Sequence, residues 1–191
     1  MTKHLDLGSG SFPRNPYAQK EVFGTDQSSD FVNNHIIKCN LGIDPIPFAG
    51  NTFDSVSAYD LLEHIPRQSN NFRNGSLTFP FIFLMNEIYR VLKSGGIFLA
   101  LTPAYPSKEA FQDPTHVNFI TEDTHYYFVK NGIDSSRYGF FGNFEALNVS
   151  RVFPEELYEG KNSFQLNLKK LRYKLLRRTI SHLKWELRAI K

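Results

Sequence analysis

The residues best suited to hold a small ligand follow short apolar segments of the chain. Three such positions succeed one another: Gly8, Ser9 and Gly10 after residues 5–7, Asp26 after residues 21–25, and Asn40 after residues 35–39. Glycine lets the backbone approach a ligand closely. An acidic side chain can accept hydrogen bonds from both hydroxyls of a ribose, and the amide oxygen of asparagine can accept one from an adenine amino group. The sequence therefore predicts a pocket for a cofactor that contains adenosine.

The same apolar segments have the length and composition of strands in a parallel sheet. Five runs, at residues 5–7, 21–25, 35–39, 53–59 and 96–102, are separated by polar or helical stretches. Ligands of an open parallel sheet bind beyond the carboxyl ends of its strands, so we expect the residues above to meet at one edge. A chain of 191 residues fits one α/β domain of this kind.

Other segments predict the remaining elements. Apolar residues at helical spacing predict a helix from Phe81 to Leu92, and Gly95 with Gly96 supplies a stop. Residues 67–78 are polar and rich in turn formers, which indicates a surface loop, and residues 183–189 alternate as in an antiparallel edge strand. The chain begins almost on its first strand, so we expect no cover helices ahead of it and a pocket that is open or closed by another chain.

Two adenosine cofactors compete for the predicted pocket. A dinucleotide requires the pattern G-x-G-x-x-G, in which a helix start holds the pyrophosphate. Here Pro13 stands at the third glycine position and Pro16 follows, which disfavours a helix at that point. S-adenosylmethionine has no pyrophosphate, so the pattern favours this sulfonium cofactor.

Four segments resemble one known family. They are residues 4–10, residues 46–56, residues 61–65 and residues 87–96. In this order they are similar to the glycine motif, the LPF–SFD segment, the LEH turn and the LKPGG turn of class I S-adenosylmethionine-dependent methyltransferases, of the small bacterial type that modifies glycans or metabolites. The resemblance implies one Rossmann-like methyltransferase domain over residues 1–191, with a mostly parallel sheet and an antiparallel C-terminal strand. Residues 1–102 would bind the cofactor, and residues 103–191 would supply the acceptor-side loop and a basic C-terminal segment.

The resemblance also implies roles for individual residues. Gly8 and Gly10 would approach the methionine moiety, Asp26 would bind the ribose, and Asn40 with Leu41 would frame the adenine. The further cofactor residues that we assign are Asp6, Ser9, Gln27 and Tyr59. Residues 11–20 are too short and too rich in proline for the first helix of the family, so we expect a loop there. Asn40 stands where the family often has aspartate, and it keeps an acceptor but loses a charge.

Residues after the fifth predicted strand are candidates for catalysis. The segment Asp113-Pro114-Thr115-His116 resembles one found in glycan-modifying methyltransferases. We assign His116 as the general base, because imidazole is available near neutral pH, and Asp113 as the group that orients it. We place Tyr105, Tyr126 and His64 at the acceptor. One alternative is that the segment is only structural. The other is that Asp113, His116 and His125 hold a divalent metal; we assign no resident metal.

Composition limits the setting and the partners. Cys39 is the only cysteine, no apolar run approaches the length of a membrane span, and no signal peptide is evident, which favours the cytoplasm. Residues 1–150 carry a net charge of −4, whereas residues 151–191 carry +7. The basic segment 169–178 could form a helix packed on its own sheet, or one on an anionic membrane at the inner face of the cell envelope; nucleic acid is disfavoured for lack of a recognition motif. The chain could also form a homo-oligomer.

The function that we predict is O-methylation of a saccharide hydroxyl, in the biosynthesis of a bacterial surface glycan. Two alternatives stay open. One is a methyltransferase for a small metabolite, and the other is a protein of the same fold that binds S-adenosylmethionine without catalysis.

Overall fold

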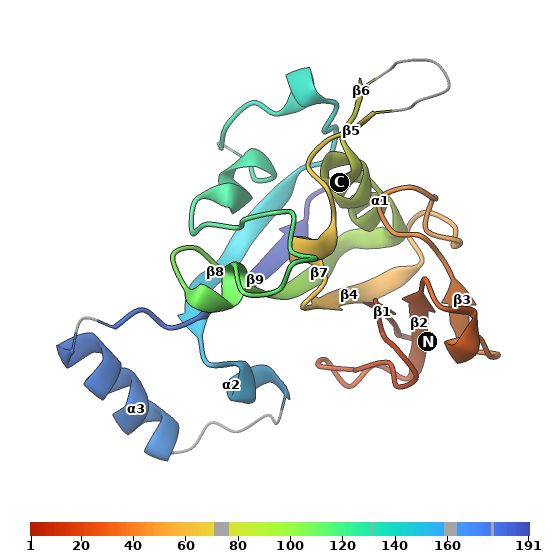
Figure 1. Cartoon of the computed structure of the whole chain (residues 1–191). Helices are drawn as coiled ribbons and strands as arrows, with labels where there is room; N and C mark the ends of the chain where they lie inside the picture. The colour runs from red at the N-terminus through yellow and green to blue at the C-terminus, as the bar shows by residue number, and fades with distance from the viewer. Residues whose placement is uncertain (71–76, 131, 159–163, 177) are drawn as a thin grey trace.

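A seven-stranded sheet forms the centre of the molecule in this computed structural model, which describes residues 1–70, 77–130, 132–158, 164–176 and 178–191 (Figure 1). The strand order is β3-β2-β1-β4-β7-β9-β8. Its strands are β1 (Lys3–Leu7), β2 (Glu21–Asp26), β3 (Ile36–Lys38), β4 (Phe53–Tyr59), β7 (Leu92–Pro103), β8 (Phe144–Val152) and β9 (His182–Ala189). Short 3-10 helices span Ser29–Phe31, Leu62–His64, Lys108–Ala110, Thr124–Tyr127 and Ser136–Tyr138.

The five predicted parallel strands are confirmed. β1 pairs in parallel with β2 and β4, β2 with β3, and β4 with β7. The sheet is therefore mostly parallel, as the sequence predicts, and the carboxyl ends of β1, β2 and β3 lie side by side.

The C-terminal strand β9 is antiparallel to both neighbours, as predicted, but it is not the edge of the sheet. It lies between β7 and β8, and β8 forms the edge. The expectation of an edge strand at residues 183–189 is wrong because β8, which the local sequence pattern does not reveal, pairs with the outer side of β9. β8 has a run of exposed residues and a register shift between Ala146 and Asn148, which hide the alternation expected of a strand.

Helix α1 (Pro80–Val91) covers one face of the sheet. Phe81, Leu84, Met85, Ile88 and Val91 are buried along one side of the helix, and proline at its start fits the first helical turn. The helix ends before the predicted stop. Leu92 is already extended and begins β7, and Gly95, with φ of +77°, lies where the pairing of that strand with β4 shifts register.

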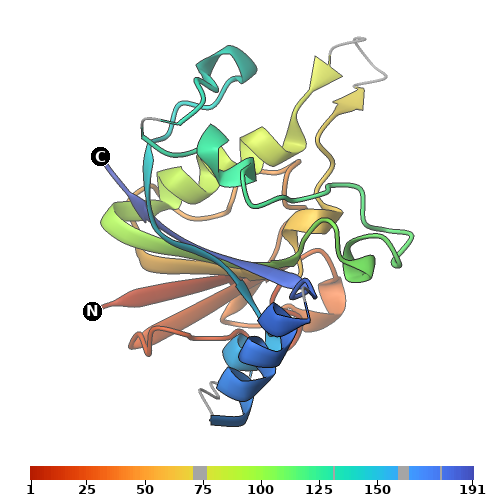
Figure 2. The same cartoon turned by 90° about the vertical axis from the view of Figure 1, so that its left-hand side faces the viewer.

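The opposite face is covered differently (Figure 2). Residues 11–20 form a loop rather than a helix, as predicted. Tyr17 of this loop and Leu157 of helix α2 (Pro154–Tyr158) pack on Tyr59, Leu99 and Leu101. Figure 2 shows α1 on one side of the sheet, and α2 with α3 (Phe164–Leu175) on the other.

The predicted surface loop at residues 67–78 contains a short antiparallel pair. β5 (Ser69–Asn70) pairs with β6 (Leu77–Thr78). Residues 71–76 between them lie outside the described residues.

The basic C-terminal segment forms helix α3 (Phe164–Leu175), which stands away from the sheet (Figure 1). Lys169 and Lys170 pair with Glu155 and Glu156 of α2 at 3.3 and 2.5 Å. Its leucine row does not pack on the sheet: Leu168, Leu171 and Leu175 are 51%, 53% and 75% exposed. The sequence left two alternatives for this segment, packing on its own sheet or binding to an anionic membrane. The structure does not show the first, because the leucine row is exposed. Within the described residues, every helix is too short or too polar to cross a bilayer.

Candidate functional site

A cavity of about 600 Å³ lies where β1, β2 and β3 end. Six residues that the sequence assigned to the site line it: Gly8, Asp26, Gln27, Asn40, Leu41 and His64. The fold therefore brings together, at one edge of the sheet, residues from four separate segments of the chain. Their binding to a cofactor stays a prediction.

The glycine loop after β1 is fixed by its backbone conformation and by Asp26. Gly8 and Gly10 have φ of +65° and +57°, which a side chain would strain. A Cβ on Gly8 would also lie 3.1 Å from Cδ1 of Leu61. The N–H of Gly10 donates to Oδ2 of Asp26 at 3.0 Å, and the N–H of Ser28 donates to Oδ1 at 2.9 Å. Asp26 therefore holds the loop in place, and each carboxylate oxygen keeps a lone pair that can accept from a ligand.

Asp6 lies beneath the glycine loop and does not line the cavity. Its carboxylate accepts from the N–H of Arg14 at 2.8 Å and from the hydroxyl of Ser57 at 2.5 Å. Burial raises the pKa of Asp6 to about 6, against the lowering effect of these hydrogen bonds. Asp6 therefore supports the loop from below.

Ser9, Gly10 and Tyr59 also do not line the cavity. The hydroxyl of Ser9 donates to the carbonyl of Gly10 at 3.1 Å, so it stabilises the loop internally. The ring of Tyr59 lies on the face of the sheet away from α1. There the Arg14 guanidinium lies 4.6 Å from the centroid of the Tyr59 ring. Strand alternation places Tyr59 on that face, and the sequence-based assignment did not take this alternation into account.

Several residues that line the cavity were not assigned from the sequence. They include Cys39, Ile43, Leu61, Ile65, Pro80 and Thr115. Leu61 and Ile65 belong to the LEH turn and Thr115 to the DPTH segment, so the motifs contained a signal for them. Pro80 is brought to the wall only by the packing of α1, and nothing in its local sequence indicates this. Burial raises the pKa of the Cys39 thiol to about 11, so the thiol is not a reactive group.

One end of the cavity carries two histidines from different segments. His64 and Thr115 line the wall, and the ring of His116 packs edge-on against His64 with centroids 4.8 Å apart. The hydroxyl of Thr115 donates to Oδ1 of Asp113 at 2.7 Å. Because that hydroxyl has one proton, it accepts from Nδ1 of His64, 3.0 Å away. In the neutral ring, Nε2 of His64 then carries a free lone pair.

His116 has the same arrangement. Its Nδ1 lies 3.2 Å from the carbonyl oxygen of Ala110, which can only accept, so Nδ1 carries the proton and Nε2 is bare. Oδ2 of Asp113 lies 3.9 Å from this Nε2. Hydrogen bonds from Thr115 lower the pKa of Asp113, so its carboxylate is charged. Asp113 therefore fixes Thr115 and, through it, the ring of His64, whereas the ring of His116 is held by the carbonyl of Ala110; orientation of His116 by Asp113 stays a prediction.

Two sequence-based placements at this end are not what the structure shows. His125 packs near Trp185, and its Nδ1 donates to the carbonyl of Glu122, so it does not join Asp113 and His116 in a metal site. Tyr126 stacks on His125 and is not part of the cavity wall. Tyr105 is exposed on the loop after β7 and lies against Phe111, with ring centroids 6.2 Å apart.

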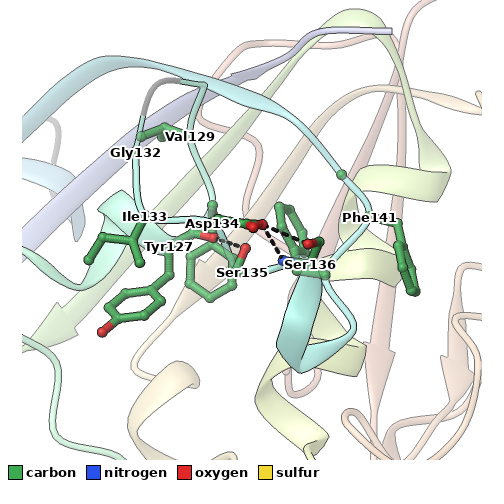
Figure 3. A pocket seen from close by; sticks show the side chains of 11 residues that line it. Tyr127, Val129, Gly132, Ile133, Asp134, Ser135, Ser136 and Phe141 are labelled. Carbon is green, nitrogen blue, oxygen red and sulfur yellow. Dashed lines mark hydrogen bonds between the residues drawn. The ribbon is translucent and has the colours of Figure 1, made fainter.

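A second cavity, of about 430 Å³, lies between residues 127 and 142 (Figure 3). None of the predicted site residues lines it. Its Asp134 carboxylate accepts from the N–H and the hydroxyl of Ser136 at 3.0 and 2.6 Å, so the charge is used within the loop itself. The cavity at the strand ends is therefore the better candidate for a cofactor.

Comparisons with known proteins concern the family and the fold of the chain. A family model described as a methyltransferase domain matches residues 5–100. No curated protein sequence matches the chain. The fold is similar to that of a complex between the Haloferax volcanii Trm112 methyltransferase activator and a methyltransferase, with 14% identity, a TM-score of 0.57, and coverage of 100% of this chain and 83% of that one.

Two further solved structures are similar. A SAM-dependent methyltransferase from Archaeoglobus fulgidus has 13% identity and a TM-score of 0.55, with 98% of this chain and 86% of that chain covered. An S-adenosylmethionine-dependent methyltransferase from Mesorhizobium loti has 15% identity and a TM-score of 0.55, with 97% and 90% covered. At such identities the likeness concerns the fold.

Replacement of Asp26 tests the cofactor end of the cavity. We expect Asp26→Ala to weaken binding of S-adenosylhomocysteine by about 1–3 kcal/mol, because the ribose hydroxyls lose a charged acceptor and Gly10 loses its anchor. Calorimetry on the purified variant measures this, with Asp30→Ala, an exposed carboxylate nearby, as the control. Unchanged affinity in a folded Asp26 variant would show that the ribose assignment is wrong.

The buried carboxylate of Asp6 predicts a pH dependence of stability. Its folded-state pKa of about 6 lies above the usual value of 3.8, so the folded protein keeps a proton that the unfolded chain loses between these values. We therefore compare the free energy of unfolding of the wild type with that of Asp6→Asn. The difference, wild type minus variant, should be largest near pH 4, fall by about 3 kcal/mol as the pH rises to 6, and then level off.

Urea unfolding of both proteins between pH 4 and pH 7 measures this difference. His4, whose pKa burial lowers to about 4, gives the opposite slope in each protein, so the comparison with Asp6→Asn is needed to isolate Asp6. A difference that stays constant across this range would contradict a raised pKa for Asp6.

Proposed function

The chain belongs to the methyltransferase domain family, and on that premise we propose that it transfers a methyl group to a hydroxyl oxygen of a saccharide. It is an S-adenosylmethionine-dependent methyltransferase, and S-adenosylmethionine is its cofactor. The choice of a saccharide as acceptor, and the roles of individual residues, are the proposal.

The cavity at the strand ends suits this cofactor. Its volume of about 600 Å³ lies in the range of small-molecule sites, about 300–1,000 Å³. When bound, S-adenosylmethionine supplies an activated methyl group on a positively charged sulfur. In the proposal Gly8 allows close approach of the methionine end, Asp26 accepts from the ribose, and Asn40 with Leu41 frames the adenine. The absence of a Cβ at Gly8 keeps the space between the loop and Leu61 open.

Exposed aromatic side chains on the loop after β7 carry the saccharide assignment. Phe111 and Phe119 are 51% and 41% exposed, and their rings stack with centroids 4.7 Å apart. Tyr105 lies edge-on against Phe111. Exposed apolar groups that cluster in this way mark binding sites rather than ordinary surface. Flat aromatic faces suit the apolar face of a sugar ring, and Asp113 on the same loop can accept from its hydroxyls.

The acceptor hydroxyl must lose its proton as the new bond to carbon forms. The lone pairs on Nε2 of His64 and His116 are the groups at this end of the cavity that can promote the loss. His64 lies on the wall and His116 directly behind it, so we assign this role to the pair, with His116 as the residue that the sequence already indicated. Held beside the methyl group, an acceptor gains from fixed orientation as well as from deprotonation.

An acceptor screen with a matched pair of variants tests the saccharide assignment. We expect methyl transfer from labelled S-adenosylmethionine to oligosaccharides, and we expect Phe111→Ala to raise KM for the saccharide about 10-fold while kcat changes little, because a stacking surface is lost. Phe141→Ala, which removes an exposed aromatic ring at the other cavity, is the control. Methylation of small metabolites but of no saccharide would show that the acceptor class is wrong.

Replacement of His116 tests the assignment of the proton. We expect His116→Ala to lower kcat about 10²-fold or more, the range for loss of a group that moves a proton, with little change in S-adenosylhomocysteine affinity. Exposed His35 provides the control variant His35→Ala. If His116 has only a structural role, His116→Ala should instead have a lower melting temperature, and its activity should fall in proportion to the fraction of protein that is folded. A folded His116 variant with wild-type turnover would move the role to His64.

A further inference from the structure

The turn after β4 and the loop after β7 bring three metal-binding side chains together. Glu63 and His64 lie on the 3-10 helix Leu62–His64, and His116 lies on the loop. One ligand atom from each residue lies within 4.8 Å of the other two. The loop is held there by its backbone, because the N–H groups of Val117 and Asn118 both donate to the carbonyl of Glu63 at 2.9 Å.

The hydrogen bonds leave both imidazoles ready to bind a cation. Thr115 and the carbonyl of Ala110 each accept from Nδ1 of one ring, so the lone pair of each ring is on Nε2. Histidine ligands in metal sites are commonly fixed in this way, with the second ring nitrogen donating to a carbonyl or another oxygen. The same hydrogen bonds set the tautomer and the ring orientation.

The third side chain has a buried oxygen without a partner. Glu63 is 1% exposed, and its Oε2 accepts from the hydroxyl of Thr102 at 3.0 Å. Its Oε1 has no hydrogen-bond partner among the described residues. A buried carboxylate oxygen without a partner is costly, and a cation at this point would remove that cost.

We propose that Glu63, His64 and His116 bind a divalent first-row transition metal ion at the acceptor end of the cavity. Two imidazole nitrogens and one carboxylate oxygen suit ions such as Zn²⁺, Mn²⁺ or Co²⁺, whereas Mg²⁺ prefers oxygen ligands alone. Bound to the ion as a carboxylate, Glu63 would supply with the neighbouring Asp113 two negative charges that balance the ion. The site differs from the Asp113, His116 and His125 alternative that the sequence suggested.

The role of the ion rests on the proposed function, whereas its binding does not. With three protein ligands, the ion keeps an open position toward the cavity that His64 lines. An acceptor hydroxyl bound there loses its proton to water more easily, because the cation stabilises the alkoxide. The alkoxide oxygen then forms the bond to the methyl carbon as the bond from that carbon to sulfur breaks, which leaves a neutral thioether. In this arrangement His64 and His116 promote the loss of the proton as ligands of the ion, and neither takes up the proton itself.

Metal binding by the chelator-treated, dialysed full chain tests the proposal. We expect calorimetry with Mn²⁺ and with Zn²⁺ to give one ion per chain, and Co²⁺ to give visible absorption typical of nitrogen and oxygen ligands. Glu63→Gln, His64→Ala and His116→Ala should each weaken binding at least about 10-fold, and Thr115→Val about 10- to 100-fold through the orientation of His64. His35→Ala should bind as wild type does, and Mg²⁺ should not compete.

The outcomes separate this inference from the proposed function. Absence of binding, or binding that survives in all three ligand variants when their melting temperatures show them folded, overturns the metal site. Full turnover of a saccharide in excess chelator overturns the part of the proposal that gives the ion a role in the reaction, and it leaves the proposed function intact. Binding of one ion that the three variants abolish, in a protein that methylates no saccharide, supports the metal site and counts against the saccharide.

Discussion

Parallel pairing of β1 with β2 on one side and β4 on the other is the constraint on which the rest of the structure depends. The side chains of β1 alternate between the two faces of the sheet, and these faces differ in polarity. Leu5 and Leu7 point into the core beneath α1, whereas His4 and Asp6 point to the opposite face, and all four are fully buried. Because β1 lies between β2 and β4, the place where it ends determines the position of the glycine loop and of the cavity at the strand ends.

The polar face of β1 is stabilised by hydrogen bonds instead of a covering helix. Ser57 donates to Asp6, so its oxygen accepts from Nε2 of His4, and Nδ1 of His4 accepts from Ser55 at 2.7 Å. Each buried polar group on this chain of contacts therefore has a partner, as burial requires. Arg14 completes it from residues 11–20, a loop that lies where a helix is common in this fold.

The sequence predicts the cofactor end of the site better than the acceptor end, for a physical reason. Gly8, Asp26 and Asn40 stand directly after strands, and strand order alone places them together. Tyr59 is misplaced because one step of strand alternation decides which face its ring occupies. Glu63 and Thr115 were missed because their positions depend on backbone hydrogen bonds between two distant segments. β8 was missed because its exposed residues hide the strand period.

The turn that contains Leu61 and Glu63 connects the two ends of the cavity. Leu61 packs at the space that a side chain on Gly8 would fill, and the carbonyl of Glu63, two residues on, holds the loop that carries Thr115 and His116. The family match covers residues 5–100 and so includes this turn, but ends before that loop. In the proposed function, the shared part of the chain holds the cofactor, while the loop beyond it supplies the side chains that meet the acceptor. Because the Leu61 side chain lies beside Gly8 and the Glu63 carbonyl binds the loop, we expect a change that shifts this turn to move the glycine loop and the histidines together.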